Sequence, residues 1–147
     1  MNVVLGIGNS LHGDDGVGPY VARTFRRKGW MSLDCGIVPE NFTSVVRKTN
    51  PELVILVDAA DMHLRPGEIR IIPSGKIADI SIGTHGPSLN AFLHFISTFI
   101  PHILFIGIQP ERIQERQSLT ESVQKGANRL IKILREDGYH AIPILQE

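Results

Sequence analysis

The sequence predicts an α/β fold in three layers, an α/β/α sandwich whose central sheet is twisted and mostly parallel. Short apolar runs of strand length alternate with stretches in which apolar residues recur at a helical period. The run LVILVDA at residues 53–59 is apolar until its end, which is typical of a parallel strand covered by helices on both faces. The chain of 147 residues has the length of one domain, so we predict a single domain over residues 1–147.

Each element has its own local signal. A helical period begins at Gly16, directly after a polar, glycine-containing loop. Pro39 and Pro87 are suited to the first turn of a helix, and Gly138 is a natural stop for the last one. The predicted strands are residues 2–7, 31–37, 53–59, 68–72 and 102–108, with an edge strand at 142–145. The predicted helices start at 16, 39, 87 and 118, the last ending at 137, while residues 74–84 show no clear pattern.

Composition excludes several classes of partner. Fifteen Lys and Arg residues balance fifteen Asp and Glu residues, so no basic excess is present to hold nucleic acid or an anionic membrane. The apolar runs are too short to cross a bilayer, and the N-terminus lacks the pattern of a signal peptide. Cys35 is the only cysteine, which rules out an intrachain disulfide and a cysteine-based zinc site. We therefore expect a cytoplasmic protein without membrane insertion.

In open parallel sheets, sites collect beyond the carboxyl ends of the strands. Three loops qualify, at residues 8–18, 58–61 and 84–87. The first, within GIGNSLHGDDGVG, lies where a dinucleotide-binding loop would lie, and Asp34 could serve as a ribose-binding acid. However, Leu11 replaces the third glycine, and Asp14 and Asp15 would repel phosphate at the helix N-terminus. The sequence thus argues against a nucleotide.

The acidic residues of these loops have both structural and functional interpretations. One of Asp14 and Asp15 is expected to cap the helix, which leaves the other for function. Asp58 closes an apolar strand, and it either bonds to loop N–H groups or reaches the site. His85 is either structural or a ligand. If Asp15, Asp58 and His85 converge, they offer two carboxylates and an imidazole to a divalent ion such as nickel or zinc, or to acid/base chemistry.

At these residues the chain resembles the NiFe-hydrogenase maturation endopeptidases over nearly its whole length. The landmarks are GIGNSLHGDDGVGP (6–19), PEN (39–41), LVILVDAADMHLRPGEIRII (53–72), THGPSLN (84–90) and LFIGIQPE (104–111). The PEN, PGEIRII and GIQP stretches are similar to the subgroup that processes the large subunit of formate-hydrogenlyase-type, membrane-bound hydrogenases. The resemblance implies the phosphorylase/hydrolase-like version of the sandwich.

The resemblance also implies a task and a set of residues. The endopeptidase removes the C-terminal extension of the hydrogenase large-subunit precursor after nickel has been inserted. Asp15, Asp58 and His85 occupy the metal-contacting positions, and the two carboxylates are also the expected catalytic groups. Asn9 and Gln109 are expected to bind substrate. The nickel is carried by the substrate, so no permanent cofactor is expected.

Two rival functions use the same residues. A nickel-binding accessory or delivery protein would bind the metal without cutting the precursor, and a related metal-dependent peptidase would cut another substrate. Cys35 is not expected to be a nucleophile, because no neighbour is evidently placed to lower the pKa of its thiol. The sequence leaves the oligomeric state open.

Overall fold

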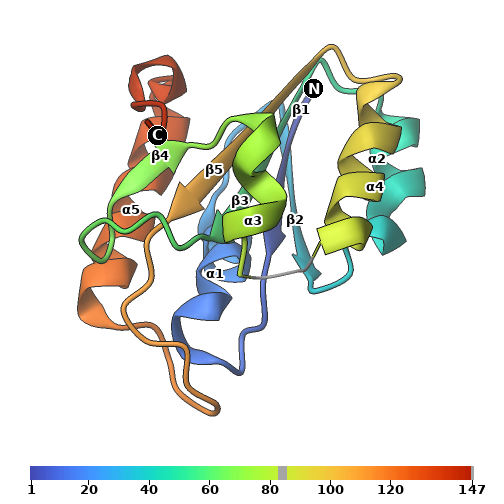
Figure 1. Ribbon diagram of the computed structural model, residues 1–147. Helices are drawn as coiled ribbons and strands as arrows, with labels where there is room; N and C mark the ends of the chain where they lie inside the picture. The colour runs from blue at the N-terminus through green and yellow to red at the C-terminus, as the bar shows by residue number, and fades with distance from the viewer. Residues whose placement is uncertain (83–85, 147) are drawn as a thin grey trace.

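The computed structural model describes residues 1–82 and 86–146 and contains a five-stranded sheet (Figure 1). The strand order is β2-β1-β3-β5-β4, in which β4 runs antiparallel to β5 and the other neighbours are parallel. The strands are β1 (Asn2–Ile7), β2 (Trp30–Gly36), β3 (Leu53–Ala59), β4 (Ile69–Ile71) and β5 (His102–Ile108). The mostly parallel sheet predicted from the sequence is therefore confirmed.

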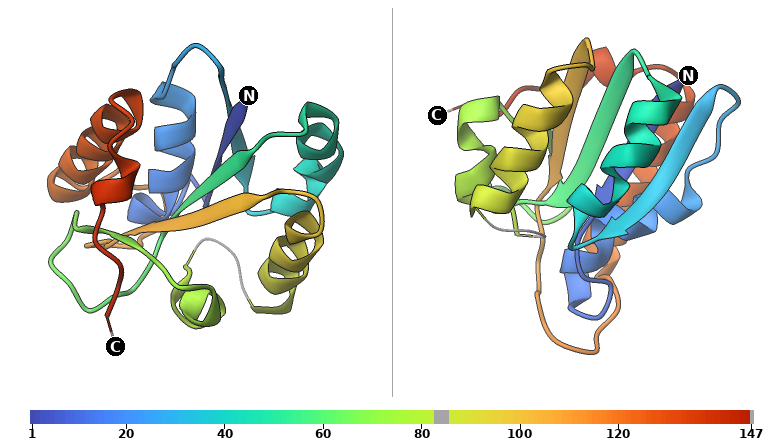
Figure 2. Two further views of the ribbon diagram at one scale, coloured as in Figure 1. Left: turned by 90° about the horizontal axis from the view of Figure 1, so that it is seen from above. Right: turned by 90° about the vertical axis from the view of Figure 1, so that its right-hand side faces the viewer.

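Helices cover both faces of this sheet (Figure 2). One face carries α1 and α5, and the other carries α2, α3 and α4. The α-helices are α1 (Val17–Thr24), α2 (Thr43–Thr49), α3 (Ile77–Ile80), α4 (Gly86–Ser97) and α5 (Glu121–Arg135). Short 3-10 helices are η1 (Gly13–Gly16), η2 (Pro39–Phe42), η3 (Ser74–Lys76) and η4 (Tyr139–Ala141).

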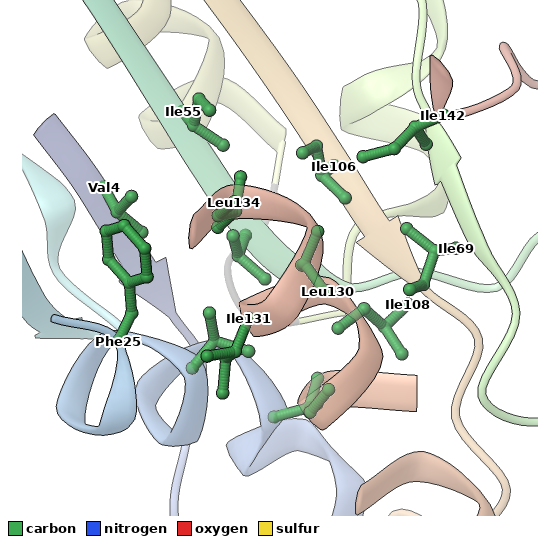
Figure 3. Packing of buried hydrophobic residues seen from close by; sticks show 14 of the residues in the cluster. Val4, Phe25, Ile55, Ile69, Ile106, Ile108, Leu130, Ile131, Leu134 and Ile142 are labelled. Atoms are coloured by element: carbon green, nitrogen blue, oxygen red, sulfur yellow. The ribbon is translucent and has the colours of Figure 1, made fainter. Parts of the chain in front are cut away.

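The central strand β3 separates two hydrophobic cores. Its residues alternate between them, because successive side chains of a strand point to opposite faces. Ile55 and Val57 belong to the core beneath α1 and α5, where Ile55 lies near Leu130 and Leu134 of α5 (Figure 3). Val54 and Leu56 belong to the core beneath α2 and α4. Every residue of β3 is buried, which explains its continuously apolar sequence.

Three elements differ from the sequence-based expectation. Helix α5 begins at Glu121 and not at 118, because Thr120 is held by a side chain from another loop, described below. The left-handed residue after α5 is Asp137, with φ of 61°, whereas Gly138 is not left-handed. Residues 142–145 do not form a strand; instead Ile144 makes one bridge to Ile71 of β4. Residues 74–82, which had no clear pattern, hold η3 and α3.

Within the described part of the chain, no helix is long and apolar enough to cross a membrane.

Candidate functional site

Asp15 lies in η1, immediately beyond the carboxyl end of β1, and only 6% of its surface is exposed. Gly8 makes this burial possible. A Cβ atom at Gly8 would overlap the backbone carbonyl of Asp15 and come within 3.3 Å of its Oδ1 atom. Gly8 also has a φ of 145°, a backbone conformation that residues with a side chain rarely adopt. The glycine therefore lets the chain turn back so that the Asp15 carboxylate sits directly against the end of β1.

Asp58 is the sixth residue of β3 and is fully buried. The hydroxyl group of Ser81 donates a hydrogen bond to its Oδ2 atom. Ser81 follows α3 and is itself 8% exposed, and a bridge from Ser81 to Ala60 holds it beside the end of β3. The sequence did not indicate Ser81, because it falls in the stretch without a clear pattern.

The two carboxylates lie at the carboxyl ends of two neighbouring strands. β1 and β3 pair in parallel with Gly6 opposite Val57, so Asp58, near the end of β3, lies level with the end of β1. η1, which carries Asp15, packs against β3. The predicted third ligand, His85, lies outside the described residues. Among residues 1–82 and 86–146, no group of three His, Cys, Asp or Glu side chains is close enough to hold a metal ion.

Asp14 has a role that the sequence did not predict. Asp14 and Asp15 both lie in the first turn of η1, as expected for capping acids, but the hydrogen bonds of the Asp14 side chain go to another loop. Its fully buried carboxylate accepts hydrogen bonds from the backbone N–H groups of Glu111 (2.8 Å), Arg112 (2.9 Å) and Thr120 (2.7 Å). The Thr120 hydroxyl adds another at 2.9 Å. Asp14 therefore fastens the loop after β5 to the loop after β1.

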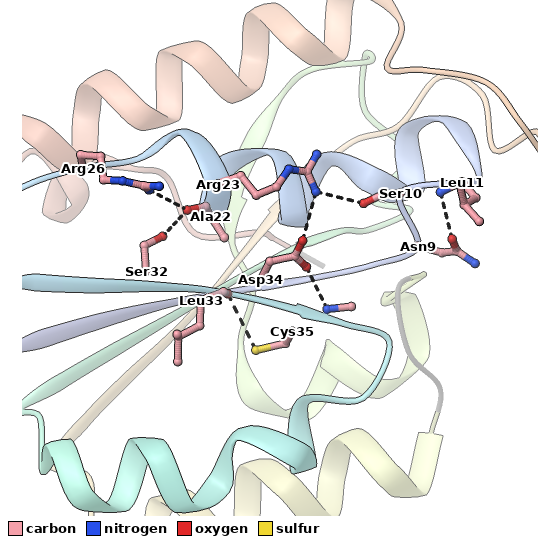
Figure 4. Close-up of polar contacts among 11 residues, drawn as sticks. Asn9, Ser10, Leu11, Ala22, Arg23, Arg26, Ser32, Leu33, Asp34 and Cys35 are labelled. Atoms are coloured by element: carbon pink, nitrogen blue, oxygen red, sulfur yellow. Dashed lines mark hydrogen bonds and ion pairs between the residues drawn. The ribbon is translucent and has the colours of Figure 1, made fainter.

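The two residues expected to bind substrate also make structural hydrogen bonds. The Oδ1 atom of Asn9 accepts from the N–H of Leu11 at 2.9 Å, which shapes the loop after β1 (Figure 4). The Oε1 atom of Gln109 accepts from the N–H groups of Met62 (2.6 Å) and Leu64 (3.3 Å). Gln109 is 7% exposed, and these two hydrogen bonds hold the segment that follows β3. Contact of either residue with a substrate stays a prediction.

Asp34, the residue that could have bound a ribose, pairs with Arg23 of α1 at 3.1 Å (Figure 4). Its other carboxylate oxygen accepts from the N–H of Gly36, and Arg23 also donates to Ser10. These bonds tie β2, α1 and the loop after β1 together. Both oxygens of the Asp34 carboxylate, which would have bound the ribose of a nucleotide, are therefore already hydrogen-bonded within the protein.

The Cys35 thiol is buried, with 4% of the residue exposed. Burial, and to a smaller extent the negative charge of Asp34, raise its pKa from 9.0 to about 12. A thiol with such a pKa is protonated at neutral pH and is a poor nucleophile. This agrees with the expectation that Cys35 does not catalyse the reaction.

The chain is similar to known proteins over most of its length. A family model described as HycI, hydrogenase maturation protease, matches residues 17–137. The hydrogenase 3 maturation protease of Escherichia coli is 36% identical over 127 residues, which cover 84% of this chain and 81% of that protein. A putative hydrogenase maturation protease of Methanocaldococcus jannaschii is 32% identical over 146 residues, covering 91% of this chain and 86% of that one.

The solution structure of the endopeptidase HycI from Escherichia coli superimposes with a TM-score of 0.89 at 32% identity, covering 99% of this chain and 97% of that one. The similarity to this endopeptidase and to the hydrogenase 3 maturation protease shows that the chain is an endopeptidase, which is a hydrolase. The chain belongs to the HycI family of hydrogenase maturation proteases. The family, the fold class and the enzymatic class predicted from the sequence are confirmed.

Proposed function

We propose that this endopeptidase removes the C-terminal extension of a NiFe-hydrogenase large-subunit precursor after nickel insertion. In this proposal Asp15, Asp58 and His85 recognise the nickel that the precursor carries. The observation that carries it is the pair of buried carboxylates, Asp15 and Asp58, at one edge of the sheet. The names of the relatives, which are hydrogenase maturation proteases, support a hydrogenase precursor as the substrate.

The chemistry of the donor set suits a substrate-borne metal. Two carboxylates and an imidazole leave coordination positions open on a divalent ion, and ligands from the precursor can fill them. Binding the nickel fixes the adjacent peptide bond against the sheet edge, which is catalysis by positioning. No resident metal is needed for this role.

The hydrolysis itself needs a base for the attacking water. We propose that one of the two aspartates takes a proton from water while the water oxygen bonds to the scissile carbonyl carbon. The same proton then passes to the amide nitrogen as the carbon–nitrogen bond breaks. This gives an aspartic-type cleavage with no covalent intermediate. We also propose a cytoplasmic location, which the free thiol of Cys35 suits.

Mass spectrometry of the precursor after incubation with the enzyme tests this function. The wild type should shorten nickel-loaded precursor and leave nickel-free precursor intact. Asp15→Asn, Asp58→Asn and His85→Ala should each lower the cleavage rate by about 100-fold or more. Asp137→Asn is the matched control, because the Asp137 side chain is 60% exposed and follows α5, outside the loops of the candidate site. Full activity in the first three variants would overturn the proposal.

A further inference from the structure

Two loops at the active edge are joined into one surface, which we call the two-loop platform (residues 8–16 and 109–120). Backbone hydrogen bonds run from Gly13 N–H to the Gln117 carbonyl (3.0 Å) and from Asp14 N–H to the Arg112 carbonyl (2.8 Å). In Figure 1 the loop after β5 extends from the lower end of the molecule beside the loop after β1. The platform carries Asp15 and is therefore continuous with the candidate site.

The loop from 109 to 120 has no helix or strand of its own, yet it is strongly fastened. Loops of this length without regular structure are uncommon in compact domains and are usually functional. A buried carboxylate is also costly unless hydrogen bonds compensate it, and Asp14 accepts from four donors of this one loop, three backbone N–H groups and one hydroxyl. The buried charge of Asp14 therefore fixes the shape of an exposed loop.

The exposed side of the platform has the composition of an interface. Leu11 is 68% exposed and Ile113 is 41% exposed, one on each loop. Residues 111–118 are all exposed, and their charges balance. These charged residues are Glu111, Arg112, Glu115 and Arg116. Exposed apolar side chains on a polar surface without net charge suit contact with a protein, and the lack of a basic excess does not suit nucleic acid or an anionic membrane.

We propose that the two-loop platform is the docking surface for the folded body of the hydrogenase precursor. Leu11 and Ile113 are its apolar contacts, and Asp14 is the positioning residue that keeps the platform rigid. This inference rests on the proposed function for the identity of the partner. It adds that part of the binding is independent of nickel, because the platform contacts the protein around the metal. The enzyme then recognises the nickel of a precursor that is already bound to the platform.

Binding measurements with nickel-loaded and nickel-free precursor separate docking from metal reading. Leu11→Ser and Ile113→Ser should each weaken binding of both forms by about tenfold, as expected for losing one apolar interface contact. Asp15→Asn should weaken binding of the loaded form only. Ile144→Ser is the matched control, since Ile144 is 55% exposed but lies beside β4. It should bind both forms as the wild type does.

Unchanged binding of nickel-free precursor to both Leu11→Ser and Ile113→Ser would overturn the docking surface. So would a change of oligomeric state in these variants without a change in precursor binding, because the platform would then cover a second copy of the chain. A wild type that binds but never shortens the precursor would instead overturn the proposed function. The two failures are thus distinguishable.

The positioning role of Asp14 is tested through KM and kcat. Asp14→Asn replaces one of the two acceptor oxygens by an NH2 group, which would face N–H donors, so the loop after β5 should be held less firmly. We expect KM for the precursor to rise by about tenfold, with kcat within about threefold of the wild type. Thr120→Val removes only the hydroxyl contact and should give a smaller rise in KM, which provides the test if Asp14→Asn does not fold. An unchanged KM in both variants would overturn the role.

Discussion

The hydroxyl group of Ser81 donates a hydrogen bond to the carboxylate of Asp58, and both residues are buried at the carboxyl end of β3. A hydrogen bond of this kind fixes the rotation of a carboxylate. It also uses one of the lone pairs of the Oδ2 atom. Ser81 thereby orients the face that Asp58 presents to a ligand, in the way that outer partners orient metal ligands in other proteins.

Ser81→Ala should lower the rate of precursor cleavage by about 10- to 100-fold, because Asp58 loses the hydrogen bond that orients it. The loss should be accompanied by only a small change in the melting temperature. Ser97→Ala is the matched control, since Ser97 donates to a backbone carbonyl on α4 and is exposed. Wild-type cleavage by Ser81→Ala would show that the hydrogen bond has no part in the reaction.

Gly8→Ala should displace Asp15, because the added methyl group would meet the backbone carbonyl of Asp15 and the φ of 145° would be strained. We expect a loss of about 2–4 kcal/mol in the free energy of unfolding and a strong loss of cleavage. Gly75→Ala serves for comparison, since no atom lies within 4 Å of its added methyl group. Urea unfolding of both variants measures the difference. Equal stabilities would contradict the assigned role of Gly8.

Gln109→Ala should release the segment after β3, because the N–H groups of Met62 and Leu64 lose their shared acceptor. The expected cost is about 2 kcal/mol in the free energy of unfolding. This experiment also separates the two roles of Gln109. A rise in KM without a loss of stability would indicate direct contact with the substrate. A loss of stability of the expected size, with KM unchanged, would leave only the structural role.

The strands of the sheet were predictable because burial leaves a direct mark on their sequence. β3 was predicted with its observed bounds, since each of its residues is buried. The loops that carry Asp15 and Asp58 were also predictable as neighbours, because the carboxyl ends of adjacent parallel strands lie together, but the choice of Asp15 over Asp14 came from the family resemblance. The partners of such residues were not predictable. Asp14 bonds to Thr120 across 106 positions, and Ser81 bonds to Asp58 across 23.

The local rules failed where a distant contact replaced a local one. The expectation that one of the adjacent acids caps a helix follows from their place in a first turn. Asp14 instead turns to the loop after β5, whose N–H groups have no helical partner to compete. The same bonds hold Thr120 and so delay the start of α5 to Glu121. These long-range hydrogen bonds thus explain both the partners of Asp14 and the later start of α5.

The thiol of Cys35 gives a prediction about pH. Burial raises its pKa to about 12 from an ordinary value of 9.0, so the folded chain keeps this proton in a range where the unfolded chain releases it. The stabilising contribution is therefore complete below about pH 9 and is lost as the pH rises toward 12. The free energy of unfolding should fall more steeply above pH 9 in the wild type than in Cys35→Ala, by up to about 1.4 kcal/mol per pH unit.

Two further measurements connect this titration to function. Native protein at pH 8 should react with iodoacetamide only after unfolding, because the thiolate is scarce and the sulfur is buried. Cys35→Ala should cleave the precursor at the wild-type rate, since the reaction uses no thiol. Parallel pH slopes in wild type and variant would contradict the raised pKa. Loss of cleavage in Cys35→Ala would contradict a mechanism built on Asp15 and Asp58, because it would return the nucleophile to the thiol.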